Sequence, residues 1–147
     1  MMSDAKPHIS IEAFDALCRR EANFVEQYGF VTEHIGYGTA RARLPFDDAH
    51  IRPGGTVSGP AMMALADFTM YALVLGMIGP VPLAVTTSLN INFLRKPGRS
   101  DVLAEARILK LGKRLAVGEV DLASVGSDDP VAHVTATYSI PPPEGRA

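Results

Sequence analysis

The sequence predicts an α+β fold in which an antiparallel sheet of about five strands wraps around one long apolar helix. Three observations favour this fold class. Residues 60–78 have helix length and are apolar on every side, residues 83–94 alternate between apolar and polar side chains, and three further strand-like runs follow with hairpin-length links. A helix without a polar face must be buried, and a curled sheet can bury it.

The size and composition of the chain indicate one domain covering residues 1–147. At 147 residues and 47% hydrophobic content, the chain can bury a single core without a disulfide or a metal. Its one cysteine, Cys18, allows no internal disulfide and no cysteine-based zinc site. The opening residues lack the apolar segment of a signal peptide. We therefore expect a cytoplasmic protein.

Several classes of function find no support in the sequence. The net charge of −2 and the absence of a basic run give no footprint for nucleic acid. We also expect no metal and no cofactor, since no glycine loop of the phosphate-binding type is present and the histidines show no ligand spacing; these are His8, His34, His50 and His133.

The segments before the long helix predict one helix, one strand and one loop. Residues 10–28 have a capping serine and amphipathic spacing, which indicate an N-terminal helix. Residues 31–44 indicate a strand, and residues 46–56 are rich in Asp, Pro and Gly, as expected for a loop. Pro60 suits the first turn of the long helix, which the prolines after Ile78 would end.

The second half of the chain predicts a run of antiparallel strands. After residues 83–94, strands are expected at 102–111, 115–124 and 131–140, joined by short glycine-containing turns. The core is thus expected over about 31–140, and the proline-rich residues 141–147 should form a disordered tail. The edge strand of such a sheet is open to pairing, so we expect a homodimer.

The long apolar helix also has the length of a membrane span. Its Asp67 argues against that alternative, because a carboxylate near the centre of a bilayer costs about 2.5 to 3.5 kcal/mol. We therefore expect the helix to be buried in protein, with no membrane association.

Asp67 is the residue that fits its surroundings least. A carboxylate in an uncharged helix must be paired, neutralised or placed at a polar cavity. It could be a structural acid bonded to the backbone, or a functional group. Its helical neighbours Met63, Ala64, Met70 and Tyr71 would form an apolar rim suited to an acyl chain, although methionines at this spacing are often core residues.

The residues around this helix resemble those of a known family. The runs 55–60, 64–67, 85–86 and 89–95, together with Leu-Gly-Lys-Arg at 111–114, are similar to the hotdog-fold acyl-CoA thioesterases of the phenylacetic-acid-degradation (PaaI-like) type. The resemblance covers about residues 45–140. In that family an acid follows nine residues after a histidine at the helix start, and Asp67 follows Ser58 by the same interval.

The resemblance implies a catalytic pair. The backbone N–H of Gly59, at the helix N-terminus, would polarise the thioester carbonyl. Asp67 would either attack that carbonyl or activate a water, and both roles stay open. The two residues are eight positions apart, about 12 Å along a helix. One carbonyl cannot contact both within one chain, so the site should combine Gly59 of one subunit with Asp67 of the other.

The sequence also departs from the family at the helix start. Ser58 stands where relatives usually have histidine, Pro60 replaces a glycine, and Arg52 stands where relatives often have Asn or Gln. Tyr71 replaces a small hydroxyl of some relatives. The candidate substrate-binding residues are Arg52, Ser58, Met63, Tyr71, Thr86 and Ser88; those for the phosphates of CoA are Arg95, Lys96, Lys113 and Arg114.

Two hypotheses of function follow from these residues. The first is an acyl-CoA thioesterase acting on a small, medium or aromatic acyl group, working as a homodimer or homotetramer. The second, motivated by the departures at Ser58, Pro60, Arg52 and Tyr71, is a protein that binds acyl-CoA or another small ligand without hydrolysis. A hotdog dehydratase fits less well, because the His- and Gly-rich signature of those enzymes is absent.

Overall fold

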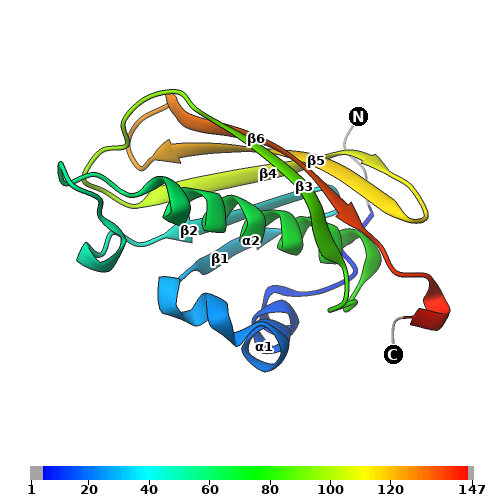
Figure 1. The fold of residues 1–147 in the computed structure, drawn as a ribbon. Coiled ribbons are helices and arrows are strands. Elements are labelled where there is room, and N and C mark those ends of the chain that lie inside the picture. Colours follow the sequence, from blue (N-terminus) through cyan, green and yellow to red (C-terminus); the bar gives the residue numbers. More distant parts are fainter. Residues whose placement is uncertain (1–4, 146–147) are drawn as a thin grey trace.

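A computed structural model describes residues 5–145, apart from the side chain of Phe24, and contains one curved sheet and one long helix (Figure 1). The elements follow the order α1(Ile11–Glu21), η1(Asn23–Tyr28), β1(Val31–Ile35), β2(Thr39–Leu44), η2(Asp48–His50), α2(Gly59–Ile78), β3(Val85–Phe93), β4(Val102–Leu111), β5(Leu115–Ser124), β6(Pro130–Ser139) and η3(Pro143–Gly145). The predicted α+β class is confirmed.

All strands lie in one antiparallel sheet. Its order is β1-β2-β4-β5-β6-β3, with every neighbouring pair antiparallel. Strands β1 and β3 are therefore the two edges. The hairpins β4–β5 and β5–β6 are the links predicted from the sequence. Strand β3 instead pairs with β6, which is not its neighbour in the sequence.

The sheet has six strands where about five were predicted. The single strand predicted for 31–44 is a hairpin, because the chain turns through Gly36, Tyr37 and Gly38 and pairs Ile35 with Ala40. Gly38 has φ +92°, a backbone conformation that side chains with a Cβ rarely adopt. The two glycines were the signal for this turn.

The N-terminal helix is shorter than the 10–28 predicted. Ser10 caps it by accepting a hydrogen bond from the Ala13 N–H, but α1 ends at Glu21 because Ala22 leaves helical geometry with φ −140°. The chain continues as the 3-10 helix η1. At the other end, η3 lies within the predicted tail 141–147, of which residues 146–147 lie outside the described residues.

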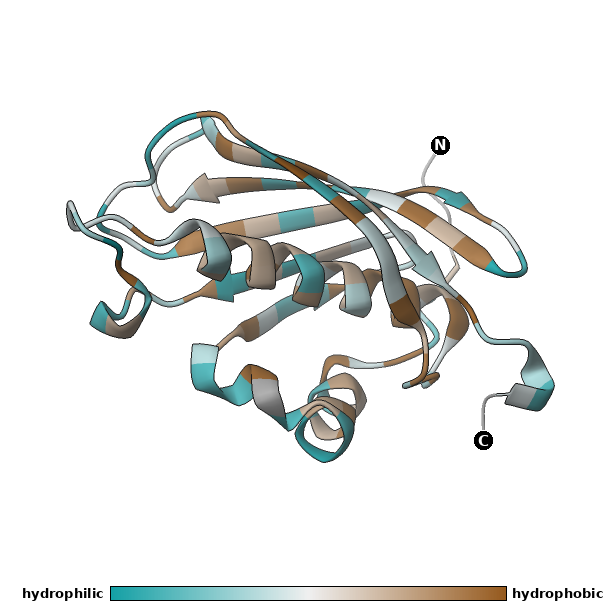
Figure 2. Cartoon of the chain, in the orientation of Figure 1, coloured by the Kyte–Doolittle hydropathy of each residue, from teal (hydrophilic) through white to brown (hydrophobic). Residues whose placement is uncertain are grey.

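Helix α2 packs its whole length against the concave face of the sheet. The residues predicted for it, 60–78, agree with the observed Gly59–Ile78. It is long and apolar enough to cross a membrane, but 72% of the qualifying stretch is buried inside the protein, so it is the core helix. Figure 2 shows α2 largely in brown and tan shades, with alternating bands along the strands.

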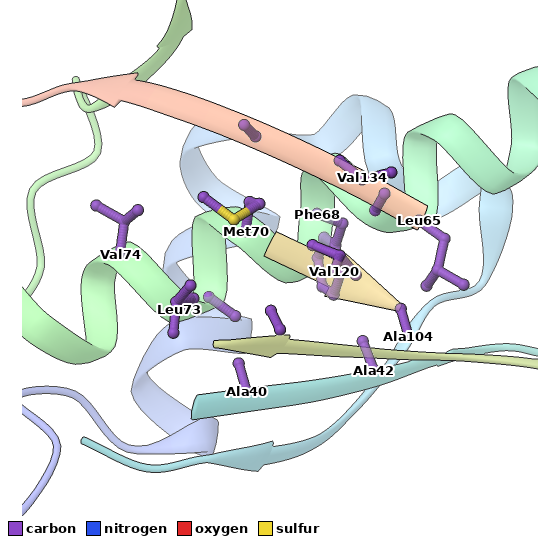
Figure 3. Close-up of a cluster of buried hydrophobic side chains, with 14 of the residues drawn as sticks. Ala40, Ala42, Leu65, Phe68, Met70, Leu73, Val74, Ala104, Val120 and Val134 are labelled. Atoms are coloured by element: carbon purple, nitrogen blue, oxygen red, sulfur yellow. The ribbon is translucent and has the colours of Figure 1, made fainter. Parts of the chain in front are cut away.

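Small residues on the sheet let α2 approach closely. Figure 3 shows Ala40, Ala42 and Ala104 of the sheet facing the larger helix side chains. At Gly118 of β5, an added Cβ would lie 2.9 Å from both Leu73 Cδ2 and Met70 Sδ. Large side chains on the helix and small ones on the sheet therefore fill one close-packed layer.

Substituting Gly118 by alanine should destabilise the protein. The new methyl group would overlap the α2 side chains and the Arg107 carbonyl oxygen, which is 3.0 Å away. Overpacking of this kind costs about 1–3 kcal/mol. Urea unfolding at one protein concentration should show a lower midpoint with an unchanged slope. Gly98→Ala is the matched control, because its nearest heavy atoms are 3.7 Å away and its free energy of unfolding should change by less than about 0.5 kcal/mol.

Candidate active site

Asp67 lies near the middle of α2, half-buried, with one carboxylate oxygen held by two hydroxyl groups. Its Oδ1 accepts hydrogen bonds from Thr86 Oγ1 at 2.6 Å and from the Tyr138 hydroxyl at 2.9 Å. The Tyr138 hydroxyl also lies 3.1 Å from the Asp67 carbonyl oxygen. Among the described residues, none donates a hydrogen bond to Oδ2. The carboxylate is thus oriented through one oxygen, and the other is left for a ligand.

A bulge in β3 brings Thr86 to Asp67. The register between β3 and β6 shifts between Thr86 and Ser88, which inserts one extra residue into β3. Regular alternation would point Thr86 away from the face that carries Leu89 and Ile91. The bulge instead turns Thr86 toward α2, together with Leu89 and Ile91, which pack against the core. Thr86, predicted as a substrate-binding residue, thus contacts Asp67, and its role in binding substrate stays a prediction.

Tyr138 is the site residue that sequence reasoning missed. It is buried on β6, on the inward-facing row that includes Val134 and Ala136. Burial raises the pKa of its hydroxyl well above the ordinary value, and the negative charge of Asp67 raises this pKa further. Tyr138 therefore stays protonated and acts as a donor. The sequence could have indicated Tyr138, because its hydroxyl is the polar group in an otherwise apolar row of the predicted strand.

A cavity of about 340 Å³ opens beside Asp67. Its polar edge is formed by Asp67, Thr86 and Tyr138, and the remaining lining is mostly apolar side chains from α2, β3 and the N-terminal segment. Tyr71 lines the cavity as predicted, but its hydroxyl donates to the Pro82 carbonyl oxygen at 3.0 Å. Tyr71, which stands where some relatives have a small hydroxyl, thus directs its own hydroxyl to the backbone.

The first turn of α2 carries the second candidate group. Ser58 is the N-cap, and its Oγ accepts a hydrogen bond from the Ala61 N–H at 3.2 Å. The hydroxyl of Ser58 is thus committed to the helix start. None of the described residues accepts a hydrogen bond from the Gly59 N–H, so this donor remains available.

Gly59 lines a different hollow from Asp67. That hollow measures about 350 Å³ and includes Arg52, Arg95 and Lys96. Three of the predicted cationic side chains therefore gather around the helix N-terminus. The separation of Gly59 from the Asp67 cavity agrees with the expectation that one chain cannot present both groups to one carbonyl.

Several predicted residues lie elsewhere. Lys113 and Arg114 occupy the β4–β5 turn, where the Arg114 Nε donates to the Ile140 carbonyl oxygen at 3.0 Å. This turn lies near the start of β3, since Val85 and Leu115 both pair with Ser139. Arg95 instead follows the end of β3, and its guanidinium donates to the Pro130 carbonyl oxygen. The single phosphate-binding rim predicted for these cations is therefore not formed within one chain.

The predicted apolar rim around Asp67 also needs correction. Met63 is 42% exposed and does not line the Asp67 cavity, and Met70 is fully buried in the core. Ala64 and Tyr71 do line it. Ser88, on the far side of the bulge, is exposed and forms no part of this cavity.

Comparison with known proteins identifies the family. The family model described as "Thioesterase superfamily" matches residues 54–130, just over half of the chain. The chain belongs to the thioesterase superfamily. Its architecture is the hotdog thioesterase fold, in which the sheet curls around the central helix. The matched region begins just before α2 and ends at the start of β6, and so contains Gly59, Asp67 and Thr86.

Solved structures and a curated relative support this family. The chain is 42% identical to a protein of Silicibacter sp. TM1040 titled a "putative thioesterase", with a TM-score of 0.83 over 93% of this chain and 95% of that one. A mutant form of the phenylacetic acid degradation protein PaaI from Thermus thermophilus is 27% identical, with a TM-score of 0.71 over 81% and 99%. A Thermoplasma acidophilum protein named "Putative esterase" is 28% identical over 69% of this chain and 75% of its own length. The family match and the names of these relatives support thioester hydrolysis in general.

The thiol of Cys18 and the hydroxyl of Tyr71, which both line the Asp67 cavity, should make the folded protein sensitive to alkali. Burial raises the pKa of Cys18 from 9.0 to about 12, and the negative charge of Asp15 adds to the shift. Burial likewise raises the pKa of Tyr71 from 10.0 to about 12. Above pH 9 the unfolded chain loses these protons before the folded one, so stability should fall as the pH rises toward 12.

Urea unfolding of wild type and Cys18→Ala between pH 8 and pH 11 tests this prediction. The variant should lose less stability per pH unit, whatever its starting stability, because one of the groups whose pKa is raised by folding is gone. The native thiol should also react slowly with a disulfide reagent at pH 8. Equal slopes for the two proteins would show that Cys18 makes no contribution.

Proposed function

We propose that this protein is an acyl-CoA thioesterase of the PaaI-like type that works as a homodimer. The observation that carries the proposal is the Asp67 carboxylate, half-buried beside an apolar cavity, with Oδ1 held by Thr86 and Tyr138 and Oδ2 open. A fixed acceptor beside an acyl-sized cavity suits attack on a thioester. The superfamily match and the 27% identity to the Thermus PaaI structure support this type.

The edge strand β3 is the proposed dimer contact. Among the described residues it pairs with β6 alone, which leaves its other edge open, and Val85 and Phe93 near its two ends are 55% and 50% exposed. Exposed apolar side chains on an unpaired edge strand are typical of a surface that meets a partner. A second copy pairing antiparallel with β3 would extend the sheet about a twofold axis.

Such a twofold axis would complete the catalytic pair. Thr86, bonded to Asp67, lies near the start of β3, while an added Cβ on Gly59 would be 3.2 Å from Phe93 Cζ at its end. An axis near the middle of β3 exchanges these two ends. It would bring Gly59 of one subunit toward Asp67 of the other, so each dimer would have two composite sites.

The reaction follows from these groups. The Gly59 N–H, aided by the dipole of α2, would stabilise negative charge on the thioester oxygen. Asp67 Oδ2 would either attack the carbonyl carbon, breaking the C–S bond to give a mixed anhydride that water then hydrolyses, or take a proton from a water that attacks. In both routes the CoA sulfur leaves and gains a proton. Arg52, Arg95 and Lys96, beside Gly59, would meet the CoA phosphates.

Asp67→Asn should abolish release of CoA thiol while the protein still folds and associates. Asparagine keeps an oxygen for Thr86 and Tyr138 but is neither a nucleophile nor a base. We expect at least a hundredfold lower kcat, measured as thiol release from a panel of short, medium and aromatic acyl-CoA esters. Asp128→Asn, an exposed acid in the β5–β6 turn, is the matched control and should stay active. If wild type releases no thiol but acyl-CoA raises its Tm, the protein binds the ester without hydrolysis.

The composite site can be tested by mixing two inactive variants. Gly59→Pro removes the N–H at a helix position where proline is tolerated, and Gly59→Ala keeps the N–H as its control. Co-expressed with Asp67→Asn at equal levels, Gly59→Pro should restore about a quarter of wild-type activity, because half of the dimers are mixed and each has one intact site. A site within one chain would give no recovery. Tetramer formation and the cytoplasmic location stay predictions.

A further inference from the structure

The far wall of the Asp67 cavity comes from the N-terminal segment, residues 18–30. Cys18, Ala22, Val25, Tyr28 and Phe30 line this cavity, and all precede the residues 54–130 that match the family model. Figure 1 shows α1 and η1 next to β1, on the side of α2 away from β4, β5 and β6. One side of the cavity is thus formed by α2 with Asp67, within the residues that match the family model. The other side is formed by residues 18–30, which lie outside that match.

Contacts on both sides of the segment hold this wall in place. The Phe14 ring packs 5.5 Å from Phe68 and 5.7 Å from Tyr71, both on α2. Thr32 Oγ1 of β1 donates to Asp15 Oδ1 at 2.8 Å, which ties α1 to the sheet. Beyond η1, the rings of Tyr28 and Phe30 stack at 5.0 Å around Gly29, whose φ of +72° allows the tight turn. A wall fixed in this way can discriminate between ligands by size.

The charges around the cavity are of one sign. Within residues 5–145, its lining includes the carboxylates of Glu21 and Asp67 but no lysine, arginine or histidine. The guanidinium of Arg20 lies 3.6 Å from the Glu21 carboxylate, yet Arg20 does not line the cavity. An acyl group ending in a carboxylate would meet negative charge and lose its hydration without gaining a cation.

We propose that the segment 18–30 is the specificity-determining wall of this enzyme, and that it selects uncharged, apolar acyl groups of medium length over acetyl and dicarboxylic acyl groups. This inference rests on the proposed thioesterase function. A volume of about 340 Å³ is at the lower end of the range for small-molecule pockets, and much larger than an acetyl group needs. Val25 is an aliphatic side chain of this wall, so a change in its size should change the length of acyl chain that the cavity holds.

The test is the acyl-length profile of kcat/KM for straight-chain acyl-CoA esters from acetyl to decanoyl. In wild type, kcat/KM should rise about fourfold per added methylene until the cavity is full, and then fall. Val25→Trp should move the optimum to shorter chains, while Val25→Ala should move it to longer chains. Gln27→Trp, on the exposed side of η1, is the matched control and should leave the profile unchanged.

A second arm tests the exclusion of negative charge. Glutaryl-CoA should be a much poorer substrate than hexanoyl-CoA for wild type, and Glu21→Arg should reduce that difference at least tenfold. If wild type prefers glutaryl-CoA, or if Glu21→Arg leaves the ratio unchanged, charge at this wall does not select the acyl group.

Binding of S-alkyl-CoA thioethers separates this inference from the proposed function. These thioethers cannot be hydrolysed, so their Kd reports the cavity alone. Tighter binding with alkyl length, with an optimum that shifts in the Val25 variants, would support the wall even if no ester were hydrolysed. An unshifted optimum in both folded variants would overturn it, whether or not wild type is a thioesterase.

Discussion

The close contact between α2 and the sheet is the constraint on which the rest of the structure depends. An added Cβ at Gly76 of α2 would come within 2.9 Å of Ile35 Cγ2, just as one at Gly118 of the sheet would meet Leu73 and Met70. The helix therefore cannot slide or rotate without collision at these two contacts with the sheet. A carboxylate on such a helix has a fixed position, which the catalytic role proposed for Asp67 requires. The core and the site are stabilised by the same packing.

Hydroxyl groups from two adjacent strands reduce the energetic cost of placing the Asp67 carboxylate beside the core. Thr86 belongs to an edge strand and Tyr138 to the strand beside it, and both reach the same oxygen of Asp67. Two hydroxyl donors offset much of the desolvation that a carboxylate suffers on burial. They also leave the acid with one face satisfied and one face open, an arrangement that a purely structural acid would not need. The site is thus assembled from parts far apart in the sequence but adjacent in the sheet.

The sequence predicted the elements with strong periodicity and missed those set by tertiary contacts. Residues 60–78 and 102–111 were predicted correctly because apolar spacing records burial directly. The hairpin at Gly36–Gly38 was missed because two short strands in succession share the pattern of one long strand. Asp67 stood out by its charge, but Tyr138 did not, since its role depends on a register between β6 and β3 that local patterns do not contain. The bulge at Thr86 was invisible for the same reason.

The two edges of the sheet are unlike, and this limits how the protein can assemble. Strand β3 has nine residues, whereas β1 has five residues and a tie to α1 through Asp15. Short, irregular and covered edges resist further pairing. In the proposed dimer, a second copy occupies the long edge β3 and leaves the short strand β1 at both ends of the joined sheet. That arrangement would disfavour growth into a fibre, since a further copy would meet only the short edge.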